Sequence, residues 1–199
     1  MTSALATAEG FASFLSQESS WLDFYRKEFG LECEPLLVCP EKRHPEVGKS
    51  FGRMIVVAQD IRMQCVFDQC QNHFNCHKHT EMELDAVVQS NDRLSASGSF
   101  AVWVRDCAEA DEEHRYRSAN ALKQMNIFGI TLLERLLYEL KYFLETGKHL
   151  DVRNITLCSG SIDIEGHVPD VFWDGEKMNV GWFSPDANYG NLRTREVVL

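Results

Sequence analysis

Cysteine and histidine residues are concentrated between positions 65 and 79, and both are residue types that bind zinc. The spacing is C-x4-C-x2-H-x2-C-H-x-H, formed by Cys65, Cys70, His73, Cys76, His77 and His79. Thiolate and imidazole are the ligands that zinc prefers, and four of them in a tetrahedral array close a structural site. We therefore predict a structural zinc site with ligands drawn from Cys70, His73, Cys76, His77 and His79.

The local secondary structure decides whether these residues can share an ion. If residues 61–74 form a helix, Cys70 and His73 lie one turn apart and can both bind. If the segment is a strand, they point to opposite faces. The alternative is that the cysteines are small core residues and the histidines lie on the surface, since the segment has no C-x2-C pair. A catalytic zinc would further need an acid or base, which Glu81 or Glu83 could supply.

A second set of reactive residue types follows near position 158. Cys158 and Ser159 could act as nucleophile, with His167 as base and Asp170 as orienting carboxylate. The G-x-S-x-G nucleophile elbow is absent, and a polar turn between strands explains the same residues. A small hydrolase is therefore the alternative function, working through a metal at residues 65–79 or through Cys158 or Ser159.

The first 30 residues show apolar side chains at steps of three and four, which predicts helices. We expect a break near Ser19 and Ser20, with Ser20 capping a second helix. Gly30 is expected to end it in the left-handed conformation.

The pattern changes to β-structure from about residue 35. Leu36–Val38 is a short apolar run and Met54–Ala58 a longer one that suits a buried strand. Apolar and acidic residues alternate over Met82–Val88, which predicts a strand with one wet face. A further strand is expected over Phe100–Val104.

One long helix is predicted over about residues 112–146, because leucines and other apolar residues form a wide face that ends at Gly147. The C-terminal part is β-structure, with a strand at Ile155–Cys158 and a hairpin around Asp174-Gly175. With a two-residue loop, Val171 would face Met178. One face of the hairpin would then carry Val171, Trp173, Met178, Val180 and Trp182.

Together these elements predict a single α+β domain over residues 1–199. It would contain N-terminal helices, a mainly antiparallel sheet, the long helix packed on that sheet, and the C-terminal β-hairpin.

The net charge of −10 is unevenly distributed. Residues 1–114 carry 19 acidic and 10 basic side chains, whereas residues 115–199 carry 11 and 10. An acidic surface can steer and dock a basic partner, and the alternative is that charge only maintains solubility. We expect the acidic N-terminal half to be the contact surface for a protein partner of basic character. Its connector carries Asp106, Glu109, Asp111, Glu112 and Glu113, and neutralising these five residues should weaken the binding. Direct nucleic-acid binding and membrane binding are not expected, because both surfaces repel acidic proteins.

The N-terminus lacks the basic region and long apolar run of a signal peptide. No segment approaches the roughly 18 apolar residues that span a bilayer. We therefore expect a soluble cytoplasmic protein with reduced thiols. The favoured function is that of a small, non-enzymatic binding protein.

Overall fold

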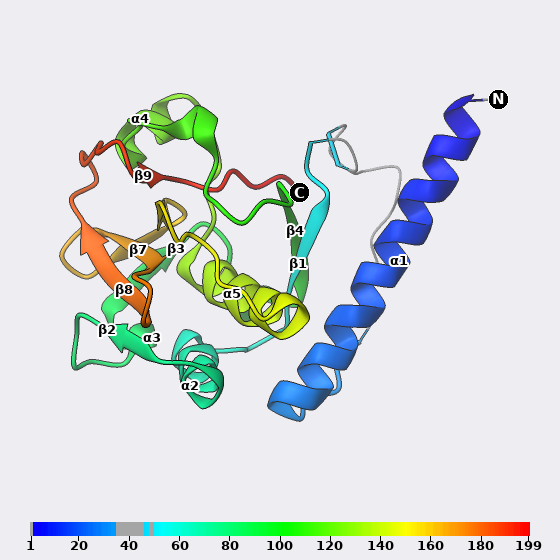
Figure 1. Ribbon diagram of the computed structural model, residues 1–199, viewed down its shortest axis with the longest axis horizontal. Coiled ribbons are helices and arrows are strands. Elements are labelled where there is room, and N and C mark those ends of the chain that lie inside the picture. Colours follow the sequence, from blue (N-terminus) through cyan, green and yellow to red (C-terminus); the bar gives the residue numbers. More distant parts are fainter. Residues whose placement is uncertain (1, 35–45, 48–49) are drawn as a thin grey trace.

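The computed structural model describes residues 2–34, 46–47 and 50–199, and its helices and strands confirm the predicted α+β class (Figure 1). The helices are α1 (Thr2–Phe29), α2 (Met63–His73), α3 (Leu84–Val87), α4 (Ala119–Gln124) and α5 (Leu132–Thr146), with short 3-10 turns η2 (Ser95–Ser97) and η3 (Glu112–His114). The strands are β1 (Arg53–Val57), β2 (Cys76–Lys78), β3 (Val88–Asn91), β4 (Phe100–Val104), β5 (Ile155–Leu157), β6 (Ser161–Asp163), β7 (Val168–Trp173), β8 (Met178–Phe183) and β9 (Leu192–Arg193).

The strands form three sheets around α5. A five-stranded sheet has the order β2-β8-β7-β5-β9, and the pairs β1-β4 and β3-β6 are antiparallel. Figure 1 shows α1 at one side, the five-stranded sheet at the other, and α5 between them. One cluster of buried apolar side chains joins these layers, from Phe14 on α1 through Leu136 on α5 to Val180 on β8.

The N-terminal segment is one helix, so the predicted break near Ser19 and Ser20 is wrong. Its buried aromatic side chains bind strand β1, because Trp21 Nε1 donates to Met54 O at 2.9 Å. Ser20 does not cap a helix; its hydroxyl accepts a hydrogen bond from Lys141 Nζ of α5 at 2.7 Å. Contacts to β1 and α5 thus accompany a helix that continues without a break through Ser19 and Ser20. Gly30 has φ +64°, which confirms the predicted left-handed cap.

The two predicted apolar strands around residues 54–58 and 100–104 are confirmed as the antiparallel pair β1-β4. The predicted strand over Met82–Val88 is wrong, because α3 occupies most of it and β3 begins only at Val88. A contact with a distant segment fixes the helical turn: the Asp85 carboxylate accepts hydrogen bonds from the first backbone N–H groups of α2, those of Met63 and Gln64. The predicted apolar run Leu36–Val38 lies outside the described residues.

The predicted helix over residues 112–146 is wrong as a single element, because η3, α4 and α5 divide it. The break lies where Gly129 packs so closely that a Cβ there would come within 1.8 Å of Ser159 Oγ. Thr131 then starts α5 with a capping box, in which its hydroxyl and the Glu134 carboxylate each bind the other's backbone N–H. The predicted end is confirmed, since Gly147 caps α5 with φ +68°.

A buried ionic network lies on the inner face of α5. Asp151 is fully buried and forms ion pairs with Arg135 at 2.9 Å and with Arg195 at 2.7 Å. Its carboxylate also accepts from the backbone N–H of Ala110 at 2.8 Å and from the Thr156 hydroxyl. One carboxylate therefore holds together α5, β5, the acidic connector and the C-terminal segment.

The predicted hairpin is β7-β8, but four residues rather than two join its strands. Trp173 pairs with Met178, and Val171 pairs with Val180 instead of Met178. Because side chains alternate with a period of two, a shift of two residues leaves the predicted apolar face intact. Val171, Met178 and Val180 are accordingly fully buried.

No helix among the described residues is both long enough and apolar enough to cross a membrane.

Candidate functional site

The predicted zinc ligands lie on α2 and on the β2 segment that follows it. Cys70 is fully buried in the core, where burial raises the pKa of its thiol well above the usual value. His73, one turn further on, uses Nε2 to contact Glu28 Oε2 of α1 at 2.7 Å. The segment is helical, as a shared site requires, but these two side chains have different surroundings.

The remaining predicted ligands, Cys76, His77 and His79, differ in how far they are buried. Cys76 is half-buried, and burial raises the pKa of its thiol to about 12. His77 and His79 are exposed, and their rings meet edge to face with centroids 4.6 Å apart. The sequence pattern thus brings the two imidazoles together and places the thiols in or near the core. The zinc site stays a prediction.

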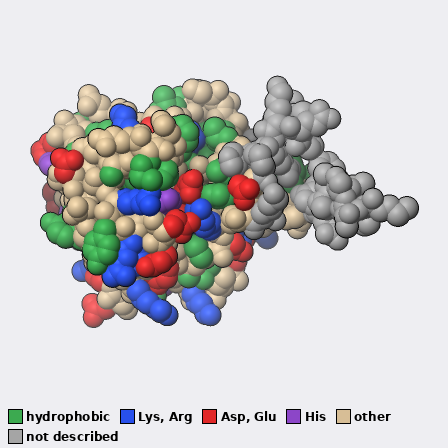
Figure 2. Space-filling view, turned by 90° about the horizontal axis from the view of Figure 1, so that it is seen from above, with side chains coloured by type: hydrophobic (Ala, Val, Ile, Leu, Met, Phe, Trp, Pro, Cys, Tyr) green, Lys and Arg blue, Asp and Glu red, His purple; other side chains and the backbone are tan. Residues whose placement is uncertain are grey.

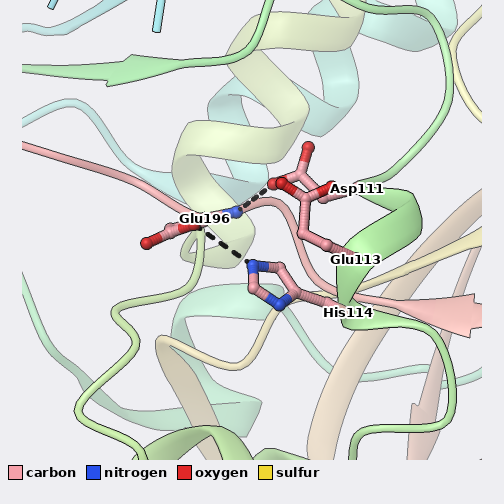
Figure 3. A group of neighbouring side chains, drawn as sticks. All are labelled: Asp111, Glu113, His114 and Glu196. Atoms are coloured by element: carbon pink, nitrogen blue, oxygen red, sulfur yellow. Dashed lines mark hydrogen bonds and ion pairs between the residues drawn. The ribbon is translucent and has the colours of Figure 1, made fainter. Parts of the chain in front are cut away.

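A different group of potential metal ligands forms where the acidic connector meets the C-terminal segment (Figure 3). Asp111, Glu113, His114 and Glu196 each place one ligand atom within 4.8 Å of the others. His114 Nε2 lies 3.2 Å from Glu196 Oε2, and the backbone N–H of Glu196 donates to Asp111 Oδ2 at 2.7 Å. Among the described residues this is the one group of that kind.

A guanidinium group already supplies the positive charge in this cluster. Arg105 lies 2.8 Å from Asp111, 2.7 Å from Glu113 and 3.0 Å from Glu196. Burial raises the pKa of the Asp111 carboxyl. Three carboxylates and one imidazole would suit a divalent cation, but such an ion would have to displace Arg105. The cluster therefore acts as an internal ion-pair centre that fastens the connector to the C-terminal segment.

Two buried atoms of this cluster, Asp111 Oδ1 and His114 Nδ1, have no hydrogen-bond partner within the described part of the chain. In Figure 3 both atoms point away from Glu196, so neither of them faces the centre of the cluster. Sequence reasoning singled out Asp111 and Glu113 only as surface acids, and no local signal links them to Glu196.

Most carboxylates of the acidic connector have partners inside the molecule. Glu112 forms ion pairs with Arg115 and Arg193, and Glu109 accepts hydrogen bonds from the backbone and side chain of Asn154. Figure 2 shows acidic and basic side chains next to one another on the face seen from above. Most of the connector's negative charges are therefore paired with groups of the same chain.

The predicted nucleophiles are not arranged for attack. Cys158 is fully buried, and burial raises the pKa of its thiol well above the usual value, so it stays protonated. Thr194 donates its hydroxyl proton to Leu157 O. The Ser159 hydroxyl, 2.9 Å from Thr194 Oγ1, therefore donates its own proton to Thr194 Oγ1. The His167 ring lies 3.6 Å from carboxylate oxygens of Asp163 and Glu165. Within the described chain, neither nucleophile has a histidine as its base.

A cavity of about 310 Å³ opens between α4, the loop that leads to α5, and the β3-β6 sheet. Leu122 and Val168, which are both buried, line it together with two exposed apolar side chains, Phe128 (61% exposed) and Ile162 (38%). Polar groups also line it: Ser90, Asp92, Asn120, Lys123, Asn126 and Ser159. Ligand-binding cavities typically measure roughly 300–1,000 Å³ and combine an apolar lining with a few polar groups. We call this the α4 cavity.

Sequence reasoning missed the α4 cavity because it placed Phe128 inside a long helix. The segment Asn126-Ile127-Phe128 is instead the loop between α4 and α5, and Asn126 has φ +56°. The useful signal was Asn126 itself followed by Gly129, since both residue types favour chain reversals.

No family model, curated protein or solved structure matches the chain.

Proposed function

We propose that this protein is a non-catalytic binding protein that holds an apolar side chain of a protein partner in the α4 cavity. The observation that carries the proposal is Phe128, which is 61% exposed at the cavity while Leu122 and Val168 inside it are buried. Exposed apolar side chains that border a recess commonly mark interaction sites.

The size and lining of the α4 cavity favour a peptide segment as its occupant. At about 310 Å³ the cavity has room for one or two large side chains. Asn126 and Lys123 beside the opening could hydrogen-bond peptide carbonyl groups, and Asp92 could accept from peptide N–H groups. Apolar anchors surrounded by adaptable polar contacts are the usual arrangement of peptide-binding surfaces.

This proposal keeps the binding role expected from the sequence but moves the contact surface. Asp111, Glu112 and Glu113 are paired with arginines of the same chain, so docking through them would require breaking those pairs. The α4 cavity needs no such exchange.

The proposal is tested by selecting peptides from a random displayed library on the purified protein. Selected peptides should share an apolar residue, and Phe128→Ala should weaken their binding at least tenfold. Leu15→Ala is the matched control, because Leu15 is also exposed (46%) but lies on α1. Selection of no peptides, or equal binding to wild type and Phe128→Ala, would overturn the proposal.

A further inference from the structure

A second recess lies at the face of the β7-β8 hairpin opposite the buried pair Val171 and Val180, and Gly181 is one of the residues that line it. Asp170 of β7 pairs directly with Gly181 of β8. On the other side of β8, His79 donates its backbone N–H to Val180 O at 2.9 Å, which places His79 beside Gly181. Side chains at alternate strand positions share a face, so Phe172 lies on the same face as Asp170, and Phe183 on the same face as Gly181. Because Asp170 and Gly181 are paired, all four residues lie on one face of the hairpin.

The recess is an open cavity of about 390 Å³. It is lined by His79, Asp170, Phe172, Gly181, Trp182 and Phe183. We call it the Asp170 cavity. It has no lining residue in common with the α4 cavity. A side chain at position 181 would crowd the carboxylate in this cavity, because a Cβ there would come within 2.9 Å of Asp170 Oδ1.

Asp170 is only 3% exposed, yet no hydrogen bond or ion pair of its carboxylate exists among the described residues. Other buried carboxylates in this fold differ: Asp151 contacts two arginines and Glu134 contacts Arg93. A buried carboxylate without a partner is costly to ionise, and burial raises the pKa of Asp170 to about 7. A positively charged ligand would remove that cost.

We propose that the Asp170 cavity binds an organic cation, an ammonium or guanidinium group, with Asp170 as its counter-ion. A neutral His79 imidazole across Gly181 can accept a second hydrogen bond from the cation. The rings of Phe172 and Phe183 present π-electrons, which attract cations of this kind. A metal ion fits less well, because one carboxylate and one imidazole fall short of the four ligands of a closed zinc site.

The cation could be a free small molecule or a lysine or arginine side chain of another protein. NMR spectroscopy tests both, by following the amide signals of Gly181 and Phe183. The probes are Nα-acetyl-arginine amide, its neutral isostere Nα-acetyl-citrulline amide, and a glycine-serine heptapeptide with one central arginine. The arginine amide should shift both signals saturably and the citrulline amide should not. Tighter binding of the heptapeptide would support a protein side chain as the source, and equal binding a free cation.

Three variants test the role of the carboxylate. Asp170→Asn should weaken binding of the arginine amide at least tenfold, and Gly181→Ala should also weaken it because the added methyl group displaces the carboxylate. Glu176→Gln, an exposed acid in the loop of the same hairpin, should leave the affinity unchanged. Equal shifts with arginine and citrulline amides, or undiminished binding to a folded Asp170→Asn variant, would overturn the proposal. Phe128→Ala should not affect this response, so the two binding sites are tested separately.

Discussion

Replacing Asp170 with asparagine should stabilise the protein more at pH 8 than at pH 5. The folded state raises the pKa of this carboxyl from 3.8 to about 7 by burial. Between these two values the folded protein binds more protons than the unfolded chain, so the free energy of unfolding falls as the pH rises. Asparagine does not titrate and removes this loss.

The size of the effect follows from the two pKa values. For a single group shifted in this way, the loss of stability between pH 5 and pH 8 is roughly 2–3 kcal/mol. The difference in unfolding free energy between Asp170→Asn and wild type should therefore grow by about that amount over this range.

Urea unfolding followed by tryptophan fluorescence at pH 5, 6, 7 and 8 measures this difference. Glu176→Gln, whose side chain is exposed on the same hairpin, is the matched control and should track wild type at every pH. A constant difference between Asp170→Asn and wild type across the series would contradict a raised pKa of Asp170 in the folded protein. It would mean that the carboxyl titrates in the folded protein as it does in water.

Three further perturbations have outcomes that the contacts predict. Asp151→Asn should lower the free energy of unfolding by about 3–5 kcal/mol, because it removes the negative charge that pairs with two buried guanidinium groups. A loss below about 1 kcal/mol in urea unfolding would contradict this. Gly129→Ala should cost about 1–3 kcal/mol through overpacking against Ser159, and a thermal midpoint equal to that of wild type would argue against the close approach. Millimolar Mn²⁺ should leave the midpoint of wild type unchanged but raise that of Arg105→Met, whose three carboxylates lose their counter-charge; stabilisation of wild type by Mn²⁺ would show that Arg105 does not occupy the site.

Local patterns in the sequence were enough to predict much of the fold. The apolar runs of β1 and β4, the hairpin β7-β8 and the glycine caps at Gly30 and Gly147 all depend on neighbouring residues. The errors arose where distant segments decide. Ser20 lies within α1, where Lys141 binds its hydroxyl, and α5 begins at Leu132, just after the segment where Gly129 meets Ser159.

The two cavities were less predictable, because each is lined by separate parts of the chain. The pairing of Asp170 with Gly181 depends on a hairpin register that differs by two residues from the one expected. The zinc site at residues 70–79 remains a sequence prediction. If it is correct, protein purified without added metal should contain about one equivalent of zinc. Elemental analysis that finds no zinc would contradict it.

The most direct test of the binding role is to map where a selected apolar peptide contacts the protein by amide chemical shifts. The largest changes should fall on α4, on the loop through Phe128 and on Ser159–Ile162, which together surround the α4 cavity. Changes concentrated on the acidic connector at residues 106–113, with the loop at Phe128 unaffected, would contradict it.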